Sequence, residues 1–244
     1  MKNLVICCVG DGSLHPQWLE GPKDFDLFLI YFGNEPGQYQ EQCQYYAQAK
    51  GSKWQLLSSQ IAEHWHWIKD YDAIWLPDDD IKTDAANINL MFDYFHRYRL
   101  PLAQPALTPD SYISLKITRQ RDWAALRYTN FVEVMVPIMT SDVLEMLLPT
   151  FTLNKTGWGV DYYWNKLIRD SGRGPLGIID AAAVTHTRPV NTNGGFYQAM
   201  GINPGEEKRE VLRRFKLSKK KRHYGAVMDW AGRAVKLRWL PYLF

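Results

Sequence analysis

The chain has 244 residues and a hydrophobic share of 46%, which fits one large α/β domain, or one domain with a tail, that buries a sizeable core. Its net charge of +3 is modest, and its three cysteines, with Cys7 beside Cys8, argue against a disulfide framework. No segment approaches the ~18 consecutive apolar residues that a membrane-spanning helix needs. The start, MKNLVICCVGDG, is too short an apolar run for a signal peptide, so we expect a cytoplasmic protein of bacterial type.

Apolar runs and helix-like segments alternate along the first hundred residues. The pattern predicts strands at residues 3–9, 25–32, 53–57 and 72–76, and helices at residues 38–50, 61–69 and 85–99. Such alternation is typical of a mostly parallel sheet with helices on its faces. We therefore expect an α/β fold of the Rossmann type over this part of the chain.

The remainder of the chain has a different pattern. Strands are expected at residues 113–118, 127–139 and 176–180, and helices at residues 142–148 and 157–170. After about Asn191, a loop-like stretch leads into a strongly basic segment. We therefore predict one α/β domain over residues 1–190 and a basic, aromatic C-terminal extension over residues 191–244.

Three consecutive carboxylates, Asp78, Asp79 and Asp80, follow the strand predicted at residues 72–76. Ligands of open α/β sheets bind beyond the carboxyl ends of the strands, which is where this acidic triplet is expected. Side chains alternate in an extended segment, so Asp78 and Asp80 are expected on one side and Asp79 on the other. A divalent cation, Mg²⁺ or Mn²⁺, would offset the repulsion between the two facing carboxylates. The plainer alternative is that Asp79 and Asp80 only favour the start of the next helix.

Three motifs occur in order along the chain: DAIWLPDDDI (72–81), GWGVD (157–161) and VTHTRP (184–189). The first resembles the strand and DXD motif of GT-A fold glycosyltransferases, and the second resembles the glycine-tryptophan-glycine-acid motif of several inverting members. The third resembles the late strand that supplies a histidine metal ligand. Together, over roughly residues 70–190, they look most like a plant and bacterial family described only as a domain of unknown function, with a glycosyltransferase-like fold.

The resemblance implies a Rossmann-like GT-A fold and a metal-dependent enzyme that uses a nucleotide-diphosphate sugar. Asp78 and Asp80 would hold the metal with His186 as a third ligand, and Arg188 would meet a phosphate oxygen. Imidazole suits Mn²⁺ better than Mg²⁺, so manganese is favoured. A histidine at a strand end is otherwise often a hydrogen-bonded structural residue, and this alternative stays open for His186.

The resemblance assigns the general base and the acceptor site to the GWGVD motif. Asp161 would accept the proton of the attacking hydroxyl, which implies inversion at the anomeric carbon. Gly157 and Gly159 would let the backbone approach a sugar, and Trp158 would stack on its face. The motif has one carboxylate here where the fuller pattern has two, which leaves Asp161 open between a base and a binder of the acceptor hydroxyl. Asp161 in a first helical turn also fits a dipole role alone, and Trp158 also fits the core.

The loop VGDGSLH (9–15) follows the first strand, at the usual nucleotide position of this kind of fold. It lacks the GxGxxG dinucleotide fingerprint, and an ordinary glycine-rich turn is the alternative. The expected donor-binding residues are Gly10, Asp11, Ser13, Asp79 and Arg188.

Basic residues crowd into residues 208–222, and an aromatic, apolar segment with further basic residues ends the chain. This combination can rest on an anionic membrane surface, so peripheral membrane contact through residues 208–244 is one expectation, and a solvated helix packed on the domain is the other. No nucleic-acid partner is expected, because the net charge is modest and no nucleic-acid-binding module is recognised.

The function implied by the resemblance is transfer of a hexose-type sugar from a nucleotide-diphosphate donor, with a UDP-sugar favoured, to a glycan or lipid-linked acceptor in cell-surface glycan assembly. One rival is another metal-dependent nucleotide enzyme, a nucleotidyltransferase or phosphohydrolase, which would use Asp78 and Asp80 and would not need GWGVD. The second rival is a non-catalytic protein that binds a sugar or a membrane.

Overall fold

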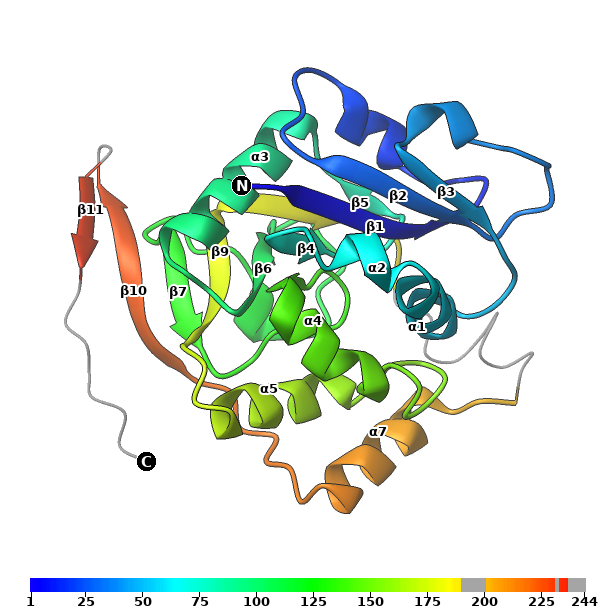
Figure 1. Ribbon diagram of the computed structural model, residues 1–244. Coiled ribbons are helices and arrows are strands. Elements are labelled where there is room, and N and C mark those ends of the chain that lie inside the picture. Colours follow the sequence, from blue (N-terminus) through cyan, green and yellow to red (C-terminus); the bar gives the residue numbers. More distant parts are fainter. Residues whose placement is uncertain (190–200, 231–232, 237–244) are drawn as a thin grey trace.

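The computed structural model describes residues 1–189, 201–230 and 233–236, and within them one large sheet runs through the molecule (Figure 1). The strand order is β11-β10-β7-β9-β6-β8-β4-β1-β2-β3, and β5 pairs with β9 beside this path. The strands are β1 (Asn3–Val9), β2 (Asp26–Tyr31), β3 (Tyr45–Gln48), β4 (Ala73–Trp75), β5 (Ile81–Lys82), β6 (Leu102–Leu107), β7 (Leu126–Thr129), β8 (Ile138–Thr140), β9 (Leu176–His186), β10 (His223–Trp230) and β11 (Arg233–Lys236).

The predicted α/β fold class is confirmed. The sheet is parallel through β4, β1, β2 and β3, and again between β6 and β9. Antiparallel pairing of β8 with β4 and β6, and of β7 with β9 and β10, makes the whole sheet mixed. The parallel part brings the carboxyl ends of β1 and β4 to the same edge.

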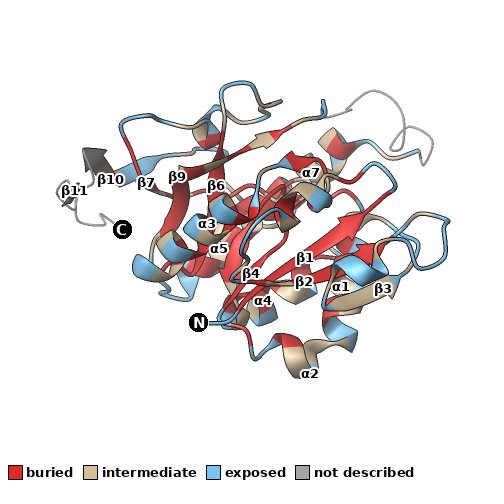
Figure 2. Ribbon diagram, turned by 90° about the horizontal axis from the view of Figure 1, so that it is seen from above, coloured by how far each residue is buried: buried red, intermediate tan, exposed pale blue. Residues whose placement is uncertain are grey.

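Helices cover both faces of the sheet, and most strand residues are buried (Figure 2). Alternate residues of β1 serve the two faces: Cys7 packs in the core beneath α3, and Ile6 packs in the core that α1, α4 and α5 cover. The helices are α1 (Lys53–Glu63), α2 (Trp65–Ile68), α3 (Ala85–Arg97), α4 (Ser141–Leu147), α5 (Val160–Asp170) and α7 (Pro204–Arg214), and the 3-10 turns are η1 (His15–Leu19), η2 (Gln40–Gln42), η3 (Lys116–Thr118) and η4 (Leu148–Thr150).

The prediction of a helix at residues 38–50 is wrong. This segment contains the short turn η2 and the edge strand β3, in which Tyr45 and Ala47 pack toward one core and Tyr46 packs toward the other. Such alternation has a period of two, and it suits a strand better than a helix.

The predictions of strands at residues 53–57 and 113–118 are also wrong. Residues 53–57 open helix α1, because Ser52 and Gln55 form a capping box at its start. Residues 113–118 contain the turn η3 and no strand. Helix α3 begins after Asp84, whose side chain accepts a hydrogen bond from the backbone N–H of Asn87.

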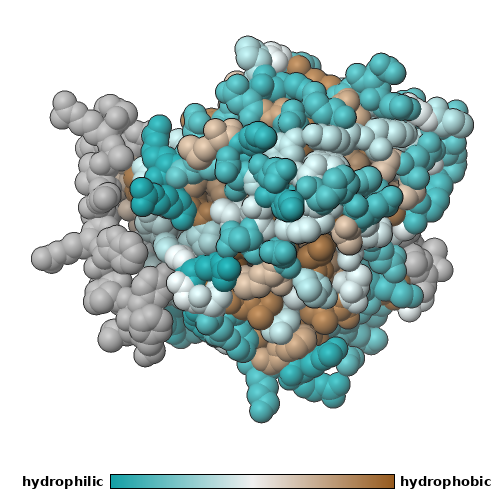
Figure 3. Space-filling model, in the orientation of Figure 1, coloured by the Kyte–Doolittle hydropathy of each residue, from teal (hydrophilic) through white to brown (hydrophobic). Residues whose placement is uncertain are grey.

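The described part of the C-terminal segment packs on the rest of the fold. Strand β10 pairs with β7, and helix α7 packs on α5 (Figure 1). The proposed boundary between residues 1–190 and 191–244 stays a prediction, and residues 190–200, 231–232 and 237–244 lie outside the described residues. None of the described helices combines the length and apolar character needed to cross a bilayer. The face of the molecule in Figure 3 is mainly hydrophilic, with smaller hydrophobic areas between.

Candidate active site

The ends of three strands bring the predicted site residues together. The first loop follows β1, the acidic triplet follows the parallel neighbour β4, and both lie at the same edge of the sheet. His186 ends β9, and its backbone pairs with Ile81 directly after the acidic triplet. Segments more than a hundred residues apart in the sequence therefore meet at one place.

Asp78, Asp80 and His186 form a cluster in which one ligand atom from each residue lies within 4.8 Å of the others. Nε2 of His186 is 3.2 Å from Oδ2 of Asp80. The Nδ1 atom of His186 donates to the carbonyl oxygen of Tyr112 at 2.8 Å, which directs Nε2 toward the acids. Two carboxylates and one imidazole nitrogen are a donor set that suits Mn²⁺ or Mg²⁺.

The surroundings of the Asp80 carboxylate also suit a bound cation. Its Oδ1 atom is buried and has no hydrogen-bond partner among the described residues. An unpartnered buried carboxylate oxygen is costly, and a metal ion is one group that can satisfy it.

Asp78 has a different neighbour, the ammonium group of Lys53. Lys53 is the first residue of α1, and its Nζ atom forms an ion pair with Oδ1 of Asp78. The same Nζ atom donates to the carbonyl oxygens of Leu76 at 3.2 Å and Met135 at 3.1 Å. Lys53 thus neutralises one of the expected metal ligands, a role that the sequence did not indicate because its segment was read as a strand.

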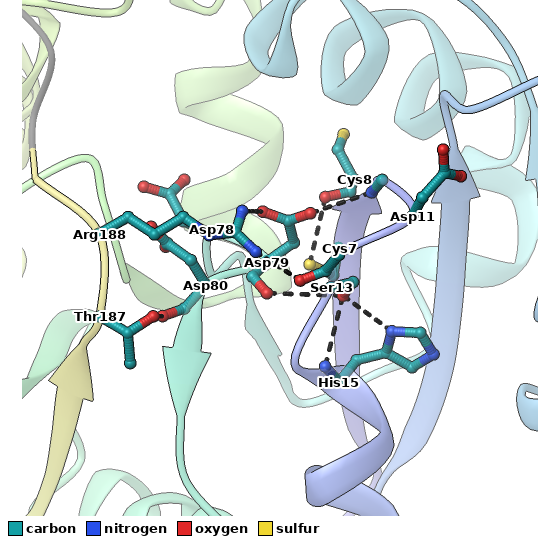
Figure 4. Close-up of polar contacts among 12 residues, drawn as sticks. Cys7, Cys8, Asp11, Ser13, His15, Asp78, Asp79, Asp80, Thr187 and Arg188 are labelled. Atoms are coloured by element: carbon teal, nitrogen blue, oxygen red, sulfur yellow. Dashed lines mark hydrogen bonds and ion pairs between the residues drawn. The ribbon is translucent and has the colours of Figure 1, made fainter.

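Asp79 faces the first loop, whereas the alternation of side chains had predicted only that it lies opposite Asp78 and Asp80. Its Oδ2 atom accepts a hydrogen bond from the backbone N–H of Gly10 at 2.9 Å, and its Oδ1 atom is 3.5 Å from a guanidinium nitrogen of Arg188 (Figure 4). Arg188 also donates to the carbonyl oxygen of Gly12. Asp79 therefore links the loop after β1 to the segment after β9.

The polar groups of Asp11 and Ser13 are engaged within the protein. The hydroxyl of Tyr31 donates to Asp11 at 2.5 Å, and Figure 4 shows the Asp11 carboxylate apart from the acidic triplet. Oγ of Ser13 is 2.8 Å from Nδ1 of His15. These contacts hold the first loop in place, and the expected donor-binding roles of both residues stay predictions.

A cavity of about 290 Å³ contains most of the predicted catalytic groups. Asp161, Trp158 and Gly159 line it, and so do Asp78 and His186. The structure thus brings the expected base, part of the expected metal site and part of the expected acceptor site into one space. The other lining residues are Ser52, Lys53, Trp54, Ser114, Leu115, Glu133, Val134, Met135, Lys155, Thr156 and Lys208.

Asp161 lies in the first turn of α5 and is 6% exposed. Its Oδ1 atom accepts a hydrogen bond from the backbone N–H of Tyr162 at 2.9 Å. Burial raises the pKa of Asp161 to about 7, although the nearby Lys208 cation acts in the opposite direction. The carboxyl therefore changes its charge near neutral pH, where a general base is most effective.

Two glycines shape the entry to α5. Gly157 and Gly159 have φ angles of 76° and 90°, a region that other residues rarely adopt. A Cβ atom on Gly157 would lie 2.1 Å from the indole Nε1 of Trp54. The close approach of this turn to Trp54 therefore requires glycine at position 157.

Helix α7 completes the cavity from the C-terminal segment. Glu207 accepts hydrogen bonds from the backbone N–H and the hydroxyl of Thr156, at 3.0 and 2.6 Å. Lys208 lines the cavity, and its Nζ atom lies 5.2 Å from the ring centroid of Tyr162. Lys208 lies in the basic segment and Glu133 in the strand expected at residues 127–139, and neither pattern indicated a place in this cavity. The expected strand is wrong over residues 130–137, which connect β7 to β8 and include Glu133.

No protein-family model and no curated protein sequence matches the chain. Among solved structures, it is similar to TarS of S. aureus, a glycosyltransferase, with a TM-score of 0.54 and 10% identity. This chain resembles TarS in fold. The similarity to TarS 1–349 in complex with UDP-GlcNAc has a TM-score of 0.59 at 9% identity and covers 88% of this chain.

The chain spans only part of these TarS structures, 43% of the longer chain and 65% of TarS 1–349 in the complex. The likeness shows a GT-A-like fold shared with TarS. At this level of identity it carries no individual residue role from TarS to this chain.

Proposed function

We propose that the protein is a metal-dependent glycosyltransferase of the hexosyltransferase type. The observation that carries the proposal is the single cavity lined by Asp161, Asp78 and His186. A sugar transfer needs a base for the acceptor and charge stabilisation for the leaving diphosphate within a few ångströms of each other, and this cavity contains candidates for both. The GT-A-like fold supports the same activity class.

The proposed donor is a nucleotide-diphosphate sugar. The complex of TarS with UDP-GlcNAc favours a UDP-sugar. The proposed donor site lies at the loop after β1, where the guanidinium group of Arg188 contacts Asp79 and Gly12 and is expected to meet a phosphate oxygen. The residues assigned to it are Gly10, Asp11, Ser13, Asp79 and Arg188.

The proposed metal ligands are Asp78, Asp80 and His186, with Mn²⁺ favoured over Mg²⁺. A divalent cation bound there would stabilise the negative charge that grows on the departing diphosphate. Lys53 lies at the same carboxylate and would add positive charge on the cavity side of Asp78.

Asp161 is the proposed general base. Its carboxylate would accept the proton of the acceptor hydroxyl as that oxygen attacks the anomeric carbon, with inversion of configuration. A pKa of about 7 makes this carboxylate a stronger base than an exposed aspartate. Gly157, Trp158 and Gly159, which precede it, are the proposed acceptor-binding residues.

The proposed acceptor is a cell-surface glycan or a lipid-linked glycan, made on the cytoplasmic side of a bacterial membrane. A second groove of about 550 Å³, called the basic groove below, is partly lined by α5 and supports peripheral membrane contact. Its apolar lining residues include Phe131, Ile168 and Leu217, and its cations are Lys166, Arg169, Arg173, Lys216, Lys220 and Arg222. Lys166 and Arg169 pair with Asp170, and Arg173 pairs with Asp142, so the proposed membrane contact relies on Lys216, Lys220 and Arg222.

The products formed from UDP-GlcNAc test the proposal against its main rival. Cleavage of the glycosidic bond releases UDP, whereas a nucleotidyltransferase or phosphohydrolase cleaves the diphosphate and releases UMP. We expect UDP as the nucleotide product with Mn²⁺, strongly reduced in Asp161→Asn. Release of UMP would instead favour the rival enzyme class.

A further inference from the structure

Glu133 is a second buried carboxyl in the cavity of Asp161. It follows β7 in a loop, and its backbone N–H donates to the side-chain oxygen of Gln104 at 2.7 Å, which fixes the backbone there. The side chain lines the cavity, and the residue is 6% exposed. Its Oε2 atom is buried and has no hydrogen-bond partner among the described residues.

The charged groups that act on Glu133 are the carboxylates of Asp161 and Asp78 and the cations of His186 and Lys221. Both cations have other partners: Nε2 of His186 is 3.2 Å from Oδ2 of Asp80, and Lys221 donates to the hydroxyl of Tyr162 at 2.6 Å. A second negative charge in the cavity would face the carboxylate of Asp161 without a partner. Burial, and then the charge of Asp161, raise the pKa of Glu133 to about 8.

We propose that Glu133 is an uncharged acid that binds the acceptor through a hydrogen bond from its Oε2 hydroxyl to an acceptor hydroxyl. The proposal rests on the function proposed above. Two carboxylates could only accept hydrogen bonds, whereas a neutral acid both donates and accepts. Glu133 would hold the acceptor while the ionised Asp161 takes the proton from the attacking oxygen. The orphaned Oε2 atom then has its partner in the bound substrate.

The protonation state of Glu133 is testable without any turnover. Between pH 4.5 and about 8 the unfolded chain releases the Glu133 proton while the folded protein keeps it, so the free energy of unfolding falls as the pH rises through this window. Glu133→Gln has no proton to release at this position, so this decrease is absent from the variant. We expect the Tm of Glu133→Gln, relative to wild type, to rise steadily from pH 5 to pH 8.

The matched control is Glu145→Gln, which makes the same chemical change at an exposed position of α4. Its Tm is expected to run parallel to that of wild type across the same pH range. An infrared difference spectrum between wild type and Glu133→Gln at pH 7 should also contain the carbonyl band of a protonated carboxyl. Parallel Tm curves for Glu133→Gln and wild type, or absence of that band, would overturn the proposal.

The acceptor role is tested with UDP-GlcNAc as donor and glycerol as a minimal hydroxyl acceptor. Loss of one hydrogen bond in Glu133→Leu should raise the KM for glycerol about tenfold with little change in donor binding. Glu133→Gln, which still donates, should restore most of this loss. The KM of wild type should rise above pH 8 and that of Glu133→Gln should stay flat.

The outcomes separate the two proposals. Equal KM values for glycerol in wild type and Glu133→Leu would overturn the acceptor role of Glu133 and leave the proposed function standing. If wild type transfers no sugar while the Tm and infrared results are as expected, the proposed function fails with this donor and the acceptor role fails with it. The neutral state of Glu133 would then remain as a finding of its own.

Discussion

At the scale of single residues, the candidate site is a set of carboxylates whose charges are balanced in different ways. Asp78 pairs with Lys53, Asp79 with Arg188, and Asp80 with His186. Asp161 has no such ion pair among the described residues and instead receives a backbone hydrogen bond. This difference fits separate roles, with the triplet facing cations and Asp161 exchanging a proton.

The substitution Asp161→Asn tests the proposed base. An amide cannot accept the proton, so we expect the rate of sugar transfer to fall by about 10²–10⁴-fold while UDP binding is retained. In wild type, kcat/KM should rise as the pH increases through about 7, because Asp161 loses its proton there. Initial rates from pH 5.5 to 8.5, with UDP binding measured in parallel, give both results. Near-normal rates of transfer in Asp161→Asn would mean that Asp161 is not the base and only favours the start of α5.

The substitution Lys53→Met tests whether Lys53 competes with a cation at Asp78. Met keeps the length of the side chain but removes the ammonium group, so the variant should be less stable without metal. It should also gain more Tm than wild type from Mn²⁺, because the freed carboxylate binds the ion more tightly. Lys69→Met, at an exposed position away from the site, is the control. The same Mn²⁺ shift in Lys53→Met and wild type would argue against competition.

At the scale of elements, the strand before the acidic triplet was predicted from its apolar run, and the placement rule for open sheets put the triplet at its carboxyl end. His186 was assigned to the same cluster only by the resemblance, and the structure brings the three side chains together. Helix α1 was not predicted, because the capping box at Ser52 competes with an apolar run that also suits a strand. The residues Lys53, Glu133 and Lys208 were missed for a related reason, since tertiary packing alone brings them to the cavity.

The turn before α5 gives a prediction at the same scale. In Gly157→Ala the new methyl group would overlap the buried ring of Trp54, and the positive φ adds backbone strain, so we expect a loss of about 2 kcal/mol or more in the free energy of unfolding. Gly172→Ala is the matched control, because Gly172 also has a positive φ and no atom within 4 Å of the added Cβ. Thermal unfolding of both variants gives the comparison. Equal losses in the free energy of unfolding for the two variants would mean that the Trp54 ring moves aside at no cost.

At the scale of the whole molecule, the C-terminal segment is part of the candidate site. Helix α7 supplies Lys208 to the cavity and fixes Thr156 through Glu207. Charge and composition after Asn191 predicted a basic extension, but they could not indicate that helix α7 packs on α5. That information lies in the tertiary contacts alone.

The basic groove gives a prediction for the molecule as a membrane partner. Reversal of Lys216, Lys220 and Arg222 to Glu should weaken binding to phosphatidylglycerol vesicles by at least about 100-fold. Each basic residue near an anionic surface contributes about 1 kcal/mol, and the new carboxylates add repulsion. Vesicle sedimentation at fixed salt measures this change. The control reverses three exposed lysines elsewhere on the surface, Lys2, Lys69 and Lys82. Equal loss in both triple variants would mean that only net charge matters.

The ends of β1, β4 and β9 form the proposed metal-dependent site for a nucleotide diphosphate. This site is tested by isothermal titration with UDP, GDP, CDP and ADP, with and without Mn²⁺, on wild type and on Asp80→Ala. We expect one diphosphate, with UDP favoured, to bind only in the presence of Mn²⁺, and we expect this binding to be lost in Asp80→Ala. Failure of wild type to bind any of the four nucleotides, or equal binding by Asp80→Ala, would contradict the proposed site.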